Sequence, residues 1–140
     1  MRSILQSEKR VCFLCRVLHG DDHEQHTHCH HVMYGIADRK ISERYGLKVY
    51  LCPKHHEFSE EAVHRNKDIN LMLRKAAQVV FITKNGNEKW QKLFNRNFLD
   101  DEELAIRADN AFEAVRALTK PKEAGAFEIT DDPIGADMPF

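Results

Sequence analysis

The sequence predicts an α+β fold. Three observations predict it: two short pairs of Cys and His residues lie far apart in the chain, a short alternating segment precedes the second pair, and an apolar pattern of helical period follows it. The length of 140 residues suits one compact domain with a tail and leaves no room for two full cores. A hydrophobic fraction of 42% then allows only a small core.

The first expected elements lie in the amino-terminal third of the chain. Residues 11–19 carry a pair of cysteines and are expected to form a strand and a turn. Residues 38–45 form a basic segment that is expected to be partly helical. The run Leu47 to Leu51 alternates and is β-branched in its middle, which favours a short strand. Cys52-Pro53 is expected to end that strand and begin a turn.

A helix is expected from about Ser59 to Asn85-Gly86, which should end it. Apolar residues recur there at steps of three and four and give one apolar face: Ile69, Met72, Leu73, Ala76, Val79 and Val80. A short amphipathic segment with Trp90, Leu93, Phe94 and Phe98 is expected to pack back on the core.

The net charge of −1 conceals an uneven distribution. Residues 1–99 carry 17 Lys and Arg against 11 Asp and Glu, a net charge of +6, whereas residues 100–140 carry 4 against 11, a net charge of −7. The first part could approach a polyanion, and the second would be repelled by one. We therefore expect two segments with different roles.

The acidic segment is expected to divide in two. Residues 100–119 should form an acidic amphipathic helix, because acidic side chains are favourable in a first helical turn. Its apolar face would be Leu104, Ala108, Ala111, Val115 and Leu118. Pro121 breaks the pattern, and residues 120–140, rich in Gly, Pro, Ala and acidic residues, are expected to be disordered.

The sequence also favours a cytoplasmic location. No apolar run reaches the roughly 18 residues that a membrane span needs. The first ten residues lack the apolar stretch and cleavage site of a signal peptide. Because cytoplasmic thiols stay reduced, regularly spaced cysteines are expected to be metal ligands rather than disulfides.

The spacing of four such residues predicts a structural zinc site. Cys12 and Cys15 are separated by two residues, as are Cys52 and His55. A two-residue gap lets both side chains of a turn face one ion, and two such pairs complete a tetrahedral site. The fourth ligand stays open at this stage, with Cys29 and His56 as alternatives to His55. A zinc ion would stabilise a core this small.

A second set of histidines predicts hydrolytic chemistry. His30 and His31 are adjacent, and His56 and His64 lie eight residues apart. A phosphodiester hydrolase needs a general base near neutral pH and a divalent cation, and imidazoles can serve as base and as ligands. Neighbouring strand residues point to opposite sides, so two adjacent histidines can take different roles. The alternative is that these histidines are exposed or structural.

Several of these motifs resemble one nuclease family. The resemblance rests on four runs within residues 10–99: Cys12-Phe13-Leu14-Cys15, His30-His31-Val32-Met33-Tyr34-Gly35, Arg39 to His56, and Ala62-Val63-His64-Arg65-Asn66. Together they are similar to the HNH (ββα-metal) endonucleases of phages and prophages, of the recombination-enhancement type that acts on DNA with RecA. The resemblance implies a zinc-stabilised, treble-clef-like ββα-metal core with additional carboxy-terminal helices, so residues 1–99 would form the nuclease-like zinc domain.

The resemblance also implies roles for single residues. His30 would be a metal ligand and His31 the general base that activates water; His56 would be the last metal-binding histidine, with His64 as a further ligand. Arg39, Lys40 and Arg44 would face the phosphate backbone. The catalytic cation could be magnesium, manganese, nickel or zinc, and a histidine-rich site favours the last three.

Two positions depart from the family pattern. Many relatives have an asparagine a few residues before the second ligand pair, where it orients the base; here Leu47 stands nearest, and Asn66 is the alternative. The residue two before the histidine pair is often acidic, and here it is His28. Both departures bear on activity more than on fold.

The carboxy-terminal residues carry a separate resemblance. Asp137-Met138-Pro139-Phe140 is similar to the acidic tip of bacterial single-stranded DNA-binding proteins. A flexible acidic segment that ends in a Phe ring and a carboxylate can dock in an apolar pocket ringed by Arg or Lys. The tip would bring the protein to enzymes that read it. The alternatives are a solubilising tail and a segment that folds onto the basic part and inhibits it.

The expected function is therefore metal-dependent hydrolysis of DNA phosphodiester bonds, linked to recombination or repair. The expected partners are DNA, a RecA-type filament and proteins that bind the tip, with no membrane. The alternative is a non-catalytic zinc module that binds DNA or protein. A pure binding module has no need of the His30, His31 and His56 set, which favours the enzyme.

Overall fold

The structure is a computed structural model that describes residues 1–119, so the expectations for residues 120–140 lie outside the described part. In chain order the elements are α1 (Phe13–His19), β1 (His28–His31), α2 (Ile36–Tyr45), β2 (Lys48–Leu51), the single π-helical turn η1 (Lys54–Phe58), α3 (Lys67–Asn85), α4 (Asn87–Phe94), the 3-10 turn η2 (Glu103–Ala105) and α5 (Ala111–Thr119). Helices with a small two-stranded sheet confirm the α+β class.

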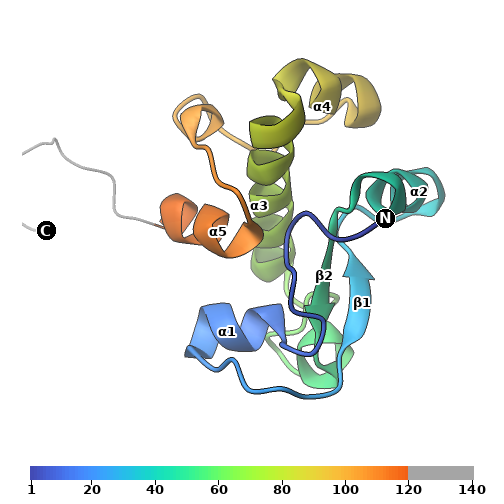
Figure 1. Ribbon diagram of the computed structural model, residues 1–140, viewed down its shortest axis with the longest axis vertical. Helices are drawn as coiled ribbons and strands as arrows, with labels where there is room; N and C mark the ends of the chain where they lie inside the picture. The colour runs from blue at the N-terminus through green and yellow to red at the C-terminus, as the bar shows by residue number, and fades with distance from the viewer. Residues whose placement is uncertain (120–140) are drawn as a thin grey trace, which may run out of the picture.

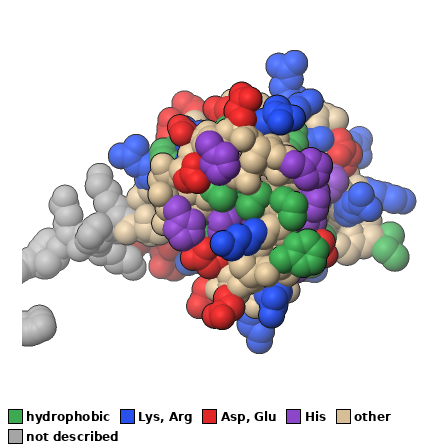
Figure 2. All heavy atoms as spheres, turned by 90° about the horizontal axis from the view of Figure 1, so that it is seen from below, with side chains coloured by type: hydrophobic (Ala, Val, Ile, Leu, Met, Phe, Trp, Pro, Cys, Tyr) green, Lys and Arg blue, Asp and Glu red, His purple; other side chains and the backbone are tan. Residues whose placement is uncertain are grey.

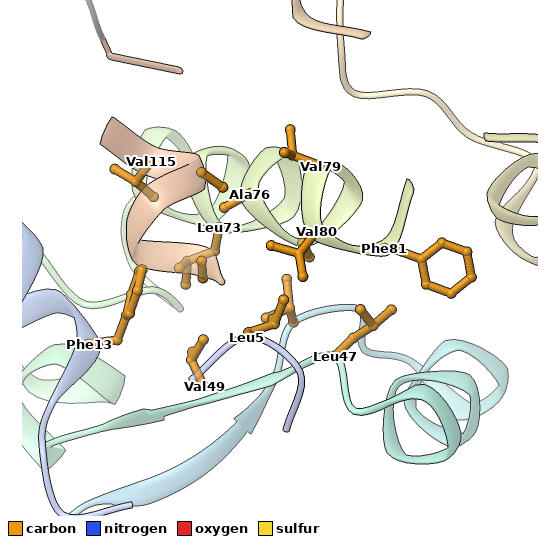
Figure 3. Close-up of a cluster of buried hydrophobic side chains, with 14 of the residues drawn as sticks. Leu5, Phe13, Leu47, Val49, Leu73, Ala76, Val79, Val80, Phe81 and Val115 are labelled. Atoms are coloured by element: carbon orange, nitrogen blue, oxygen red, sulfur yellow. The ribbon is translucent and has the colours of Figure 1, made fainter. Parts of the chain in front are cut away.

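The long helix α3 forms the centre of the molecule, with the sheet and α1 near one end, α4 at the other and α5 along its side (Figure 1). The apolar face expected from the sequence is confirmed, because Leu73, Ala76, Val79 and Val80 are buried. In Figure 3 Leu73 and Val80 face Leu5, Phe13, Leu47 and Val49 from the amino-terminal segment, α1 and the β2 region, whereas Ala76 lies beside Val115 of α5. Burial of this common core attaches the small sheet to the helices.

The sheet positions the histidines of β1. Strands β1 and β2 pair antiparallel, with His30 opposite Val49 and His31 opposite Lys48. Helix α2 connects the two strands and ends at Gly46, whose φ of 72° is a left-handed cap conformation. Because successive residues of a strand face opposite sides, His30 and His31 are presented in different directions.

Two expected elements differ near the ligand pairs. Residues 13–19 are helical rather than extended, because the Cys12 sulfur accepts a hydrogen bond from the Cys15 backbone nitrogen at the helix start and Gly20 ends the helix with φ 65°. Helix α3 begins at Lys67 rather than near Ser59, since the Asn66 side chain caps it by accepting from Asp68 N and Ile69 N. Its end at Asn85 is as expected.

The expected single helix over residues 100–119 is wrong. Asp100 and Glu103 exchange backbone-to-carboxylate hydrogen bonds of 3.0 and 2.8 Å, but the turn they start ends after Ala105. The chain then crosses to α3, where Ala108 N donates to Thr83 Oγ1 at 3.0 Å. Helix α5 starts only at Ala111 and packs against α3 and α1. The expected apolar residues are nevertheless used, because Ala108, Ala111 and Val115 are buried.

Helix length and composition also bear on the membrane expectation. Within residues 1–119, none of the helices is both long and apolar enough to cross a membrane.

Candidate metal centres

The two expected ligand pairs meet in one place. We call Cys12, Cys15, Cys52 and His55 the cysteine cluster; one ligand atom from each lies within 4.8 Å of the others. The Nδ1 atom of His55 is 3.5, 3.3 and 3.5 Å from the three sulfurs, and the sulfurs of Cys15 and Cys52 are 3.9 Å apart. All three cysteines are free thiols, so no disulfide closes the site.

These distances fit a zinc ion. Tetrahedral zinc with bonds of about 2.3 Å to sulfur and about 2.0 Å to nitrogen places neighbouring ligand atoms about 3.5 to 3.8 Å apart. Burial and the neighbouring thiol of Cys12 raise the pKa of the Cys15 thiol to about 12, and burial also raises that of Cys12. Thiols grouped in this way need a cation to become thiolates. The cluster can therefore hold a metal ion such as zinc.

A carboxylate supports the histidine of this cluster. Glu61 Oε1 lies 3.1 Å from His55 Nε2 and 2.8 Å from His19 Nε2. An imidazole that binds a metal through one nitrogen usually donates its other N–H to such a group, which fixes the tautomer and ring orientation. Glu61 thus directs the Nδ1 lone pair of His55 towards the sulfurs. Its role was not visible in the sequence.

The turn η1 directs two neighbouring histidines to different places. His55 is buried in the cysteine cluster, while His56 lies among other histidines. Backbone hydrogen bonds from His56 N to Cys52 O and from Val63 N to His55 O, of 2.9 and 2.8 Å, hold the turn. The alternatives for the fourth ligand are thereby resolved: Cys29 is exposed on β1, and His56 belongs to the second group.

The second group consists of His30, His56 and His64, which we call the histidine cluster. One ring nitrogen of each lies within 4.8 Å of the others, and the Nε2 atoms of His56 and His64 are 3.2 Å apart. Nitrogen ligands on a tetrahedral ion with bonds of about 2.0 Å would be about 3.3 Å apart. Strand β1, turn η1 and the following loop each supply one histidine of this cluster.

The buried member of the histidine cluster has an unused ring nitrogen. His30 is 3% exposed, and its Nε2 has no hydrogen-bond partner within the described chain. Burial, with smaller contributions from His64 and His56, lowers the pKa of His30 to about 3. Burial likewise lowers the pKa of His56. Neutral imidazoles with free lone pairs are the form that binds a metal ion.

His28 supports His56 from the other side. The Nδ1 atoms of the two rings are 3.1 Å apart, so both ring nitrogens of His56 face histidines. His28 therefore contacts a member of the histidine cluster. If His56 Nδ1 carries the proton and donates it to His28, the lone pair of His56 Nε2 is free to bind a metal ion.

His31 lies apart from the histidine cluster. Its Nε2 is 2.9 Å from Glu43 Oε1 of α2, and its side chain is only 13% exposed. Hydrogen bonds from His31, the amino group of Met1 and Lys48 hold the pKa of the Glu43 carboxyl well below its usual range. Asn66 does not orient His31, because its side chain caps α3 and donates to Glu60 O. Glu43 orients the His31 ring instead, and the spacing of residues in the sequence did not predict this contact.

A hollow of about 410 Å³ lies beside His31. Ile36, Arg39, Lys40 and Glu43 line it with His31. Of the three cations expected to face DNA, Arg39 and Lys40 are therefore next to His31. Arg44 is exposed too, but its guanidinium lies 6.0 Å from the centroid of the Tyr45 ring and does not line the hollow.

Figure 2 shows the molecule from the lower end of Figure 1. Several histidine side chains lie on this face, with both basic and acidic side chains among them. Comparison of the chain with models of protein families, with characterised proteins and with solved structures found no match. The function is therefore argued from the two clusters themselves.

Proposed function

We propose that the chain is a metal-dependent DNA endonuclease of the HNH, or ββα-metal, type. The observation that carries the proposal is the histidine cluster: three imidazoles from separate elements converge, and the buried His30 Nε2 has no other partner in residues 1–119. Burying a polar atom without a hydrogen bond is costly, so a purely structural role leaves this atom unexplained. In this proposal β1, β2 and the segment from η1 into α3 correspond to the ββα-metal core.

The proposed division of labour separates structure from chemistry. Zinc in the cysteine cluster would fix the turn η1, and with it the position of His56. A divalent cation held by the histidine cluster would act as a Lewis acid on the phosphate and stabilise the leaving oxygen. Three nitrogen ligands favour manganese, nickel or zinc over magnesium, which prefers oxygen.

His31 is the proposed general base. Its Nε2 faces the Glu43 carboxylate at 2.9 Å, so Nε2 would carry the proton and Nδ1 would be free to accept one. The water oxygen would attack phosphorus as Nδ1 takes its proton. The bond from phosphorus to the leaving oxygen breaks, and that oxygen gains a proton from solvent. Glu43 would stabilise the resulting imidazolium.

DNA is the proposed substrate because of the charge around His31. Arg39 and Lys40 line the hollow beside His31, where they would contact phosphates flanking the scissile bond. A RecA-type filament and proteins that read the Asp137–Phe140 tip are proposed partners on the basis of the resemblances alone.

DNA cleavage by the purified zinc-bound protein tests the proposal. Plasmid and single-stranded DNA would be incubated with magnesium, manganese, nickel or zinc, with and without a RecA filament. We expect metal-dependent cutting that falls at least about 100-fold in His31→Ala, since general base catalysis contributes roughly 10²- to 10⁴-fold. The zinc content of that variant should equal that of the wild type. Absence of cutting by the wild type under every condition would contradict the proposal and favour a zinc-dependent binding module.

A further inference from the structure

The guanidinium of Arg74, on α3, lies close to the histidine cluster. Its central carbon is 4.9 Å from the centroid of the Tyr34 ring and 5.7 Å from that of Phe98. The Tyr34 ring in turn lies 5.4 Å from the ring of His64 and 5.8 Å from that of His30. Contacts with two aromatic rings hold a guanidinium in place.

Arg74 has no carboxylate partner within residues 1–119. Three other arginines of residues 1–119 do have one: Arg10 lies 3.9 Å from Glu24, Arg16 lies 3.5 Å from Glu8, and Arg96 lies 3.5 Å from Asp38. The Nε atom of Arg74 is buried without a hydrogen-bond partner, and within residues 1–119 no carboxylate lies within ion-pair distance of its side chain. A buried N–H left unpaired costs about 1 to 3 kcal/mol.

The carboxylate of Glu57 approaches the histidine cluster from the side of His56 Nδ1, at 4.0 Å, whereas His56 Nε2 faces His64. Imidazoles bind a metal ion in their neutral form, so the three histidines themselves would not compensate the charge of a divalent cation. The positive charge of Arg74 adds to it, and two cations side by side repel. An anion that contacts both would remove the repulsion and satisfy the unpaired N–H. A phosphate fits, because its several oxygens can bind the metal and accept from the planar fork of an arginine together.

We propose that Arg74 is a phosphate-binding residue of this site, held by Tyr34 and Phe98, and that it donates to the non-bridging oxygens of the phosphodiester. The inference rests on the proposed function for the identity of the ligand, but anion binding at Arg74 can be measured without cleavage. Arg74 contacts the substrate in this account, whereas Tyr34 and Phe98 are positioning residues.

Inorganic phosphate binding tests the inference. The zinc-bound protein, saturated with manganese, would be titrated with inorganic phosphate by calorimetry, using wild type, Arg74→Gln and Arg74→Lys. The matched control is Arg116→Gln, because Arg116 also lies over an aromatic ring, 5.8 Å from the Phe112 centroid, but on α5 outside the histidine cluster. We expect roughly 10- to 100-fold weaker phosphate binding in Arg74→Gln, as for loss of a charge-assisted hydrogen bond. The phosphate affinity of Arg74→Lys should lie between those of wild type and Arg74→Gln, and that of Arg116→Gln should equal that of wild type.

The affinity for manganese separates this role from a structural one. Loss of a neighbouring positive charge should leave manganese binding to Arg74→Gln equal to that of wild type or tighter. Phosphate affinity equal to wild type, or manganese affinity lost in parallel, would overturn the inference.

Cleavage separates failure of the inference from failure of the proposed function. Normal cutting and normal phosphate binding by Arg74→Gln would overturn the inference and leave the nuclease proposal standing. A wild type that binds phosphate through Arg74 but cuts no DNA would support the anion site and contradict the nuclease.

Discussion

Two neighbouring residues of one turn, His55 and His56, belong to two different clusters. His55 faces three sulfurs and His56 faces two other cluster histidines. Their separation follows from the π-helical turn η1, where consecutive side chains diverge. A change that distorts this turn should therefore affect both clusters, whereas a change to one ring should affect one.

The contact between Glu61 and His55 gives a first prediction. Glu61→Gln removes the charge that receives the His55 Nε2 proton and should weaken zinc binding roughly 10- to 100-fold, the usual effect of losing such a support. Competition with a chelator of known affinity measures how tightly each variant binds zinc. Glu60→Gln is the control, because Glu60 is exposed and outside the ligand groups. Equal affinities for the two variants would contradict this role.

Burial of His30 predicts an acid-sensitive fold. The pKa of His30 is lowered from 6.5 to about 3, so on acidification the unfolded chain takes up a proton first. The free energy of unfolding should therefore fall by about 1.4 kcal/mol for each pH unit below 6.5, until about pH 3. Denaturant unfolding at pH 7 and 5.5, with structural zinc but no further cation, compares wild type with His30→Phe. Both proteins keep the cysteine cluster, so the wild type should lose more unfolding free energy than His30→Phe between the two pH values. Equal losses in the two proteins would contradict this prediction.

Spacing alone could predict the ligands but not their supports. Two-residue gaps predicted the three cysteines and favoured His55 without excluding Cys29 or His56. The sequence also grouped His31 with His30, His56 and His64, whereas the structure places His31 apart. Glu43, Glu61 and Arg74 reach their partners from separate elements, and ordinary surface Glu and Arg residues look the same in a sequence. Only the packing of α2, the loop before α3 and α3 itself brings them to the histidines.

At the scale of elements, the junction between α2 and β2 is a close backbone contact. Gly46 has φ 72°, and a Cβ there would meet the backbone oxygen of Arg2 at 2.3 Å. Ile4 N also donates to Gly46 O at 2.9 Å, so the amino-terminal segment is fixed across this junction. The junction sets where β2 begins, and β2 holds β1 and its histidines.

Alanine at Gly46 should therefore destabilise the fold more than alanine at Gly20. Both glycines have left-handed φ, which costs an L-residue about 1 to 2 kcal/mol, but a Cβ at Gly20 meets nothing within 4 Å. The difference between Gly46→Ala and Gly20→Ala in denaturant unfolding isolates the backbone clash. Equal losses would show that the amino-terminal segment does not pack as described.

Elements were predicted where periodicity was long and missed where local hydrogen bonds decided. The face of α3 followed from apolar spacing, its end at Asn85 from the Asn85-Gly86 pair, and β2 from alternation. Residues 13–19 were expected to be extended, but the Cys12 sulfur caps a helix there. The acidic run at Asp100 starts only a short turn, because Thr83 of α3 binds the chain at Ala108.

At the scale of the whole molecule, the two clusters divide two tasks. The cysteine cluster joins the start of α1, the end of β2 and the turn η1. Its ion would therefore stabilise the end of the molecule that carries the histidines, since structural zinc contributes directly to folding. The histidine cluster joins β1, η1 and the loop before α3, where a second ion would be less buried and easier to remove.

The number of metal ions held by the folded chain tests this account most directly. Native mass spectrometry of the zinc-saturated protein, with circular dichroism as chelator is added, follows both sites. We predict two ions. The ion of the histidine cluster leaves first, with the fold intact, and is absent in His64→Ala. The ion of the cysteine cluster leaves as the end of the molecule that carries the sheet unfolds. A single ion at saturation, with the same count in His64→Ala, would contradict a metal centre at the histidine cluster.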